Sequence, residues 1–292
     1  MGVKFIAEVS SNHGADLDRA IEFIRVSANI GCDAVKFQLF KIDQLFAPEI
    51  LEKSWEHRRR KEWELPEEYI PELATYAHDL GLEFGCTPFY LDAVDILEPH
   101  VDFFKIASYE LLWTDLLEKC TRTGKPVMLS TGMATEEEIQ SAYSICAKEG
   151  VADLTIFHCN SSYPTPLNEV NLQVIDRLRR VFNQSNPQPK IGWSDHSRNP
   201  AVIQRAVHHY NVDTVEFHLD LDTKGEEYSA GHCWLPVEME LVIQQIKMAE
   251  KADGSGLVEY SNAEAPEREW RADPLDGLRP FTKLRTHFKG DE

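Results

Sequence analysis

Short apolar runs alternate with longer amphipathic segments along the whole chain. The runs are five to seven residues long and rich in branched and aromatic side chains, which is typical of strands buried on both faces. Eight segments fit this description: residues 4–9, 34–39, 82–87, 101–107, 126–130, 154–159, 190–194 and 214–219. The segments between them predict helices over residues 16–30, from Thr135 onward with a Thr135–Glu138 capping box, over 200–210 and over 236–252.

This alternation of strands and helices predicts a parallel sheet. Eight such units in about 250 residues match the size of a (β/α)8 TIM barrel. The alternative is a doubly wound open sheet, which usually has fewer strands, and no G-x-G-x-x-G follows the first strand. We therefore predict a (β/α)8 TIM barrel over residues 1–253.

Two segments lie outside the alternation. Residues 41–64 form a long insert after the second strand, and it ends in a basic run, Arg58–Lys61. We interpret that run as a solvated helical face, with a lid edge that attracts anions as the alternative. Residues 254–292 are highly charged and predict an irregular arm over the barrel.

Composition and charge limit the partners. The chain carries 30 Lys and Arg against 49 Asp and Glu, a formal net charge of −19, so we expect neither nucleic acid nor a membrane as a partner. No stretch approaches the ~20 apolar residues of a membrane-spanning helix. The six cysteines form no C-x-x-C and no secretory signal accompanies them, so we expect reduced thiols in a cytoplasmic protein.

Polar residues gather where strands end. In a barrel, alternate strand residues point inward and chemistry collects at the carboxyl ends of the strands. On four strands one parity class carries ionisable or hydrogen-bonding groups at that end: Glu8 with Ser10, Lys36 with Gln38, Ser194 with His196, and Glu216 with His218. Any one of them could be a satisfied polar group that packs against a helix. Agreement among four strands favours a site, because a buried charge is costly unless it is paired or used.

Two strand lysines, Lys36 and Lys105, point to an anion site. Each follows apolar residues, and an inward pair of ammonium groups requires an anion between them. Hydroxyl groups stand at neighbouring strand ends: Thr87, Ser108, Ser130, Thr131, Ser161 and Ser194. Lysines with hydroxyls and backbone N–H groups form phosphate or carboxylate pockets. The alternative is a Schiff-base lysine.

Two histidines end adjacent strands. His196 and His218 have the spacing to bind a borderline divalent metal with positions left open for substrate and water. The alternative is one acid/base histidine and one structural histidine. His232 is a further ligand or a substrate contact.

The chain also resembles a known family. Eight motifs occur in the order found in sialic acid synthases (N-acetylneuraminate synthases and relatives, NeuB-like) between Phe5 and about Asp222. The motifs are AEVSSNHGADLDRA, AVKFQLF, CTPF, FKIAS, MLSTGMAT, HCNSSYPTP, GWSDHS and EFHLDLD. The family fold is a (β/α)8 barrel, in agreement with the periodicity.

The resemblance implies an activity: condensation of phosphoenolpyruvate with an N-acetyl-hexosamine aldehyde, which gives a nine-carbon 2-keto acid and releases phosphate. It implies that His196 and His218 hold a metal, usually Mn²⁺ with Mg²⁺ or Co²⁺ as alternatives. It also implies that Glu8 handles protons and that Tyr163 faces the sugar, while Gln38 shares the face of Lys36 and is a further candidate contact. The implied phosphoenolpyruvate contacts are Lys36, Thr87, Lys105, Ser108, Ser130, Ser161 and Ser194.

Three features depart from that family. Phe217 replaces a usual lysine and by parity points outward, the segment KGEEYSAGHCWLP replaces a P-G-P-D-H-like loop, and residues 254–292 are too short for the C-terminal antifreeze-like (SAF) domain of many members. We therefore expect the chemistry to be retained, with N-acetylmannosamine or a related hexosamine as acceptor, in a homodimer. The competing hypotheses are a Schiff-base aldolase or lyase, and a catalytically silent sugar-phosphate-binding protein.

Overall fold

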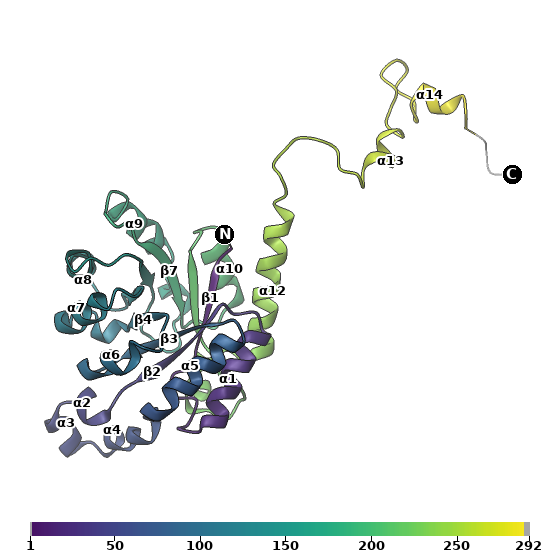
Figure 1. Cartoon of the computed structure of the whole chain (residues 1–292). Coiled ribbons are helices and arrows are strands. Elements are labelled where there is room, and N and C mark those ends of the chain that lie inside the picture. The colour runs from purple at the N-terminus through teal and green to yellow at the C-terminus, as the bar shows by residue number, and fades with distance from the viewer. Residues whose placement is uncertain (1, 289–292) are drawn as a thin grey trace. The chain divides into compact units, whose positions relative to one another are not determined.

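A computed structural model describes residues 2–288 of the chain. Within these residues, eight parallel strands pair in sequence order and close into a barrel (Figure 1). The strands are β1 (Lys4–Glu8), β2 (Ala34–Leu39), β3 (Glu83–Pro88), β4 (Phe103–Ile106), β5 (Val127–Ser130), β6 (Leu154–His158), β7 (Lys190–Asp195) and β8 (Thr214–His218). The barrel closes where Ile6 pairs with Glu216 and Glu8 with His218. The predicted (β/α)8 TIM barrel is confirmed.

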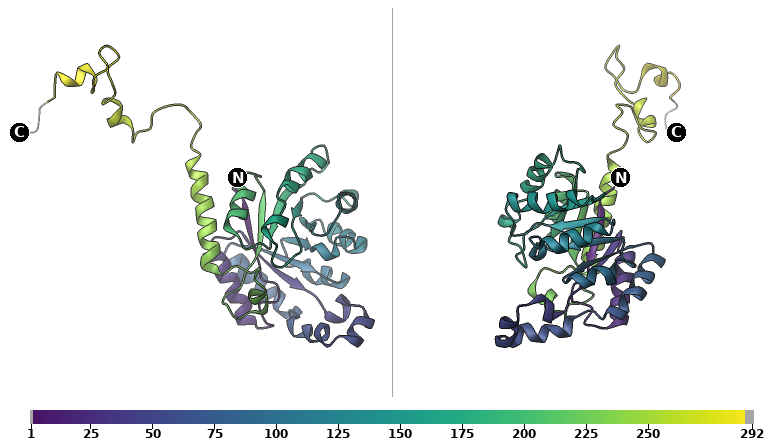
Figure 2. Two further views of the ribbon diagram at one scale, coloured as in Figure 1. Left: turned by 180° about the vertical axis from the view of Figure 1, so that it is seen from behind. Right: turned by 60° about the vertical axis from the view of Figure 1, so that its left-hand side comes forward.

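Helices surround the strands, as both views in Figure 2 show. The main helices are α1 (Leu17–Asn29), α5 (Ile70–Asp79), α6 (Leu91–Leu97), α7 (Thr114–Arg122), α8 (Glu136–Lys148), α9 (Gln173–Val181), α10 (Pro200–His208) and α12 (Pro236–Ala252). Thr135 and Glu138 form the predicted capping box of α8. Among residues 2–288, none of the helices combines the length and hydropathy that a bilayer-spanning helix requires.

The predicted strand limits hold to within two residues. The largest difference is β4, which begins at Phe103 and not at residue 101. Val101 N–H donates to the Leu97 carbonyl and so still belongs to the end of α6, and a single 3₁₀ turn, η3 (Ser108–Glu110), follows the strand. Periodicity assigns the apolar Val101 to the strand, but its local hydrogen bond to Leu97 keeps it out of β4.

The core has two parts on either side of the strands. The larger part lies between barrel and helices, and it contains the fully buried Phe217, so the prediction that this residue points outward is confirmed. The smaller part fills the barrel itself: Ile6, Ala34, Phe103, Met128 and Phe157. A Cβ on Gly192 would lie 2.6 Å from the Phe157 ring, so glycine is required for that ring to fit. These apolar side chains fill the barrel interior, while polar groups occupy the carboxyl ends of the strands.

The insert after β2 folds into short helices beside the end of that strand (Figure 1). They are α2 (Ile42–Leu45), α3 (Pro48–Lys53), α4 (Trp55–Arg59) and the 3₁₀ turns η1 (Arg60–Trp63) and η2 (Glu67–Tyr69). Two more short elements occur later, η4 (Leu167–Glu169) and α11 (Glu226–Ala230).

The chain divides into two compact units, Met1–Ala249 and Glu250–Glu292, close to the predicted boundary at 253. By itself, the described part of the second unit contains the one-turn helices α13 (Ala265–Arg268) and α14 (Thr282–Arg285). Asp273 holds it together by accepting from the N–H groups of Leu275 and Thr282 at 3.0 and 2.7 Å. The proposed absence of an antifreeze-like domain and the placement of this segment over the barrel stay predictions.

Candidate active site

A small cavity of about 60 Å³ lies at the carboxyl ends of the strands. Parity predicted that Glu8, Lys36, Gln38, Ser194, His196 and His218 would reach this end of the barrel, and the strand-end groups and the family resemblance supplied the other candidates. Eleven of the twelve predicted site residues line the cavity: Glu8, Lys36, Gln38, Thr87, Lys105, Ser108, Ser130, Tyr163, Ser194, His196 and His218. The twelfth, Ser161, lies beside it. Glu216 also lines this inner cavity. The structure therefore brings the predicted residues together, while their roles stay predictions.

Four buried charges meet in the inner cavity. Lys105 Nζ donates to Ser130 Oγ at 2.6 Å and to Glu216 Oε1 at 3.1 Å. Lys36 Nζ pairs with Glu8 and lies 3.8 Å from Glu216 Oε2. Each of these side chains is less than 5% exposed. The anion expected between the two lysines is thus supplied by the chain itself, as Glu216.

This pairing fixes the charge states. Burial acts to raise the pKa of Glu216, but the ammonium groups of Lys105 and Lys36 hold it at about 2. Burial likewise opposes a charged Lys36, yet the carboxylates of Glu216 and Glu8 outweigh it and raise the Lys36 pKa. Lys36 is therefore an ammonium group at neutral pH, which suits anion binding and opposes the neutral amine that a Schiff base needs.

Glu8 is held by two neighbours. Its Oε1 accepts from the Ser10 backbone N–H at 3.0 Å and from Gln38 Nε2 at 2.7 Å. Ser10 lies two residues beyond Glu8, the last residue of β1, so the turn that follows the strand orients the carboxylate. Gln38, which shares one face of β2 with Lys36, therefore helps to position the Glu8 carboxylate.

A pair of hydroxyls surrounds Gly132. Ser108 Oγ accepts from Gly132 N–H at 3.0 Å, and the buried Ser161 Oγ has no hydrogen-bond partner within the described chain. A Cβ on Gly132 would lie 2.9 Å from Ser108 Oγ and would overlap Ser161 Oγ. Only glycine lets both hydroxyls approach this backbone, and such a cradle suits oxygens of an anionic ligand.

The two predicted metal histidines are neighbours. The ring centroids of His196 and His218 lie 5.3 Å apart, and Tyr163 packs on His196 at 4.2 Å. His196 Nδ1 bonds the Asn160 carbonyl at 2.7 Å, which leaves Nε2 with its lone pair. Burial, and then His218, lowers the pKa of His196 to about 3, so this imidazole is neutral and able to bind a metal.

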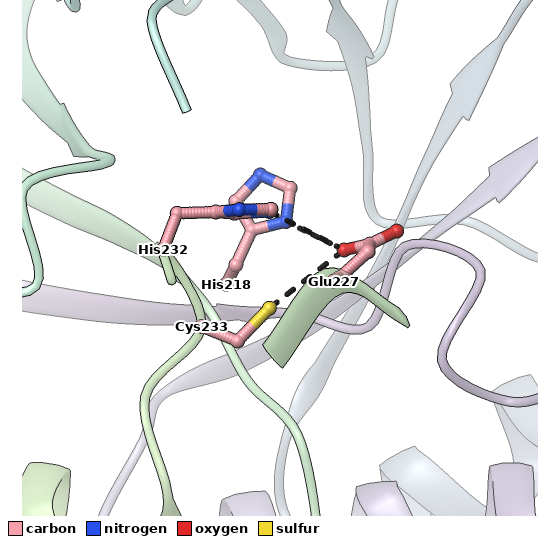
Figure 3. A group of neighbouring side chains, drawn as sticks. All are labelled: His218, Glu227, His232 and Cys233. Carbon is pink, nitrogen blue, oxygen red and sulfur yellow. Dashed lines mark hydrogen bonds and ion pairs between the residues drawn. The ribbon is translucent and has the colours of Figure 1, made fainter. Parts of the chain in front are cut away.

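A second group of donors surrounds Glu227, as Figure 3 shows. Glu227 Oε2 lies 3.3 Å from His218 Nδ1, 3.6 Å from His232 Nε2 and 3.8 Å from Cys233 Sγ. One ligand atom from each of these four residues lies within 4.8 Å of the others. In the sequence, Glu227, His232 and Cys233 belong to the segment KGEEYSAGHCWLP that departs from the family, and only His232 was considered as a ligand. An imidazole next to a thiol in GHCW was the signal for a metal-binding group.

The electrostatics of this group follow from Glu227. Burial acts to raise its pKa, but hydrogen bonds from His218 and His232 hold the pKa well below its usual range. In return, Glu227 raises the pKa of His218 against the effect of burial, whereas burial lowers that of His232. The donor set is two imidazoles, a carboxylate and a thiol, and it fits a divalent metal.

A larger outer cavity of about 740 Å³ adjoins this site. Gln38, Tyr163 and His218 line both cavities. The insert supplies an apolar wall and one guanidinium: Ile42, Leu45, Phe46, Arg60 and Trp63.

The residues of the basic run lie in two different surroundings, and the role of the run stays a prediction. Lys61 is exposed and pairs with Asp43 at 3.1 Å, as on a solvated face. Arg60 instead lines the outer cavity with its guanidinium 5.5 Å from the Trp63 ring, and its buried Nε has no hydrogen-bond partner in the described residues.

Glu110 is a cavity residue that sequence reasoning missed. It lies in η3, a single turn with no periodicity, and it lines the outer cavity. Burial raises its pKa to about 7, so this carboxyl can hold or release a proton near neutral pH.

The sequence model of the NeuB family matches residues 23–257. The chain is 32% identical over 274 residues to the N,N'-diacetyllegionaminic acid synthase of Campylobacter jejuni, covering 89% of this chain and 80% of that protein. It is 31% identical over 264 residues to human N-acetylneuraminate-9-phosphate synthase, covering 86% and 71%. It is also 38% identical over 254 residues to an uncharacterized protein of Methanocaldococcus jannaschii, covering 86% and 72%.

The structure has the same fold as a solved relative. The N-acetylneuraminic acid (sialic acid) synthetase of Leptospira borgpetersenii superimposes with a TM-score of 0.79 at 28% identity, covering 93% of this chain and 92% of that chain. Together with the family match, these relatives show that the chain belongs to the NeuB family, whose named members here include sialic and legionaminic acid synthases.

Proposed function

We propose that this protein condenses phosphoenolpyruvate with an aldose, N-acetylmannosamine or a related hexosamine, to a nine-carbon 2-keto sugar acid with release of phosphate. The observation that supports this most is the convergence of two lysines, several hydroxyls and two imidazoles on one cavity that shares walls with a larger one. The family match gives the reaction type, and the two cavities give places for two substrates.

Phosphoenolpyruvate can use the hydrogen-bond donors that the ion pairs of the inner cavity leave free. An ammonium group has three donors, and Lys105 uses two of them on Ser130 and Glu216, so one remains for a ligand. Thr87 Oγ1 accepts from Lys36 at 3.1 Å and keeps its own proton to donate. The hydroxyls of Ser108 and Ser161, which both approach Gly132, offer further donors to phosphate oxygens.

The aldose fits the outer cavity. Its apolar wall from the insert suits the methyl group of an acetamido substituent, and Glu110 and Ser10 offer hydrogen bonds to sugar hydroxyls. Binding there places the aldehyde end beside Tyr163 and His218, where the two cavities meet. Holding both substrates in this way supplies proximity and orientation.

The residues then divide the chemistry. A divalent metal held by His196 and His218, Mn²⁺ or alternatively Mg²⁺ or Co²⁺, supplies Lewis-acid polarisation of the aldehyde oxygen when bound. The lysines and hydroxyls hold the enol phosphate so that its C3 faces the aldehyde carbon. Bond formation leaves positive character at C2, and Glu8 takes a proton from the water that adds there. The resulting tetrahedral carbon expels phosphate toward the lysines and the serine cradle.

The alternatives have less support. A Schiff-base aldolase needs an amine that loses its proton, whereas carboxylates hold Lys36 protonated. A silent binding protein has no use for four buried charges in mutual contact beside two imidazoles.

A homodimer and a cytoplasmic location stay predictions, and light scattering on the purified protein tests the first.

The test is a panel of aldoses with phosphoenolpyruvate and Mn²⁺, scored by phosphate release and product mass. We expect release that depends on one aldose class and a product that joins both carbon skeletons. His218→Ala abolishes turnover, while the exposed His208→Ala serves as control and retains it. Release without any aldose requirement, or none with any aldose, overturns the proposal.

A further inference from the structure

We propose that Glu227, His232 and Cys233 join His218 in a four-donor metal site, which gives this protein a preference for Zn²⁺ or Co²⁺ over Mn²⁺. The family resemblance implies that His196 and His218 hold the metal. In this further proposal the same single ion is bound through His218, and Glu227, His232 and Cys233 take the place of His196 as its ligands. The catalytic importance of the site rests on the proposed function, but metal binding itself is measured without turnover.

The distances match a tetrahedron. Bonds of about 2.0–2.1 Å to nitrogen or oxygen and 2.3 Å to sulfur place tetrahedral ligands about 3.3–3.6 Å apart. Glu227 Oε2 lies 3.3 Å from His218 Nδ1, 3.6 Å from His232 Nε2 and 3.8 Å from Cys233 Sγ. No two of the four ligand atoms lie more than 4.8 Å apart, so a small inward movement suffices to enclose an ion. Figure 3 shows the two imidazoles and the Cys233 thiol on one side of the Glu227 carboxylate, next to the same oxygen, Oε2.

Hydrogen bonds to Glu227 Oε1 fix the orientation of the carboxylate. Glu227 Oε1 accepts from the hydroxyls of Ser10 and Ser11 at 2.6 and 2.8 Å. These two hydroxyls fix the side chain and turn Oε2 toward the imidazoles and the thiol. Outer contacts of this kind orient the ligands in metal sites.

The segment after β8 is tied back to the strand that carries His218. Trp234 N–H donates to the His218 carbonyl at 2.8 Å, and Asp220 N–H donates to the Trp234 carbonyl at 2.9 Å. Asn12 Nδ2 bonds both the Leu219 carbonyl at 3.0 Å and Cys233 Sγ at 3.6 Å. Cys233 is therefore held beside the strand end by backbone pairing, with little freedom to move away.

The donor types decide the metal. A thiolate with two imidazoles suits Zn²⁺ and Co²⁺, whereas Mn²⁺ prefers oxygen ligands. A thiolate and a carboxylate also balance the charge of a divalent ion in a buried place. His218, Glu227 and His232 line the outer cavity and Cys233 lies behind them, so the site faces the space proposed for the aldose.

The experiment uses the full chain, stripped with a chelator and titrated with Co²⁺. We expect one ion per chain, a tetrahedral visible spectrum, and a thiolate-to-cobalt charge-transfer band in the near ultraviolet. Cys233→Ser removes that band, while the equally buried Cys146→Ser keeps it. His232→Ala and Glu227→Gln each weaken Zn²⁺ binding more than about 100-fold. His196→Ala leaves the band in place. Competition between Zn²⁺ and Mn²⁺ favours Zn²⁺.

Three results overturn the proposal: no metal binding, a wild-type cobalt spectrum without the thiolate band, or affinity that survives in His232→Ala and disappears in His196→Ala. Circular dichroism checks each variant, and if Cys233→Ser does not fold, the loss of affinity in Glu227→Gln decides. Condensation with Mn²⁺ in a protein without the thiolate band refutes this site alone. A thiolate band without condensation for any aldose refutes the proposed function alone.

Discussion

Neutralising Glu216 tests whether the inner cavity is a balanced set of charges. Glu216→Gln keeps the shape of the side chain but leaves the ammonium groups of Lys36 and Lys105 facing one carboxylate, Glu8. At an effective dielectric of about 20, a unit charge pair at 3.1 Å is worth about 5 kcal/mol, before relaxation. Breaking a buried pair by removing one partner costs about 3–5 kcal/mol in practice.

That cost is large enough to measure by thermal unfolding. A unit the size of Met1–Ala249 loses about 2–4 °C of melting temperature per kcal/mol, so we expect a fall of about 6–20 °C. Glu83→Gln is the matched control, because Glu83 pairs with Lys4 at the surface, where an ion pair contributes about 0–1 kcal/mol.

Added anions sharpen the test. Inorganic phosphate or phosphoenolpyruvate supplies the missing negative charge, so each raises the melting temperature of Glu216→Gln more than that of the wild type. The reasoning is refuted if Glu216→Gln and the Glu83→Gln control have the same melting temperature, or if added anions stabilise Glu216→Gln and the wild type equally.

Three further changes probe the cavities. The Glu110 carboxyl has a folded pKa of about 7, above the ordinary 4.5, so it stabilises the wild type at low pH and this stabilisation is lost as the pH rises from about 4.5 to 7. Glu110→Gln has no carboxyl to titrate. In urea unfolding, the free energy of unfolding of the variant relative to that of the wild type is therefore about 3 kcal/mol higher at pH 8 than at pH 4. Gly132→Ala displaces the serine cradle and lowers kcat/KM for phosphoenolpyruvate about 100-fold while circular dichroism stays unchanged. Arg60→Ala raises KM for the aldose at least about tenfold with kcat retained, whereas the solvated Lys61→Ala changes neither.

The strands could be predicted because burial on both faces makes each one a short apolar run. The side chains that face the barrel interior could be predicted because they recur at every second position of such a run. Lys36 and Gln38 lie two residues apart in an apolar run, and the barrel places both in the inner cavity. His196 and His218 end neighbouring strands, so their proximity followed from order alone. Periodicity is local, and these residues need only local information.

Other contacts depend on closure of the barrel. Lys105 and Glu216 are 111 residues apart and belong to strands that are not paired, so their contact across the barrel interior leaves no pattern in the sequence. Glu110 and Glu227 lie on short turns outside any repeat, where neither parity nor helical spacing applies. Glu110 was found only in the structure. The sequence showed Glu227 within a segment that departs from the family, but only the structure shows its contact with His218.

The two cavities are made by different parts of the chain. Strand ends, fixed by the hydrogen-bond register of the barrel, build the inner one, while much of the outer one comes from the insert after β2 and the segment after β8. Substitutions in the insert after β2 can change the shape of the outer cavity without touching the ammonium and carboxylate groups of the inner one. The acceptor that we propose can therefore change while the groups proposed for bond formation stay in place.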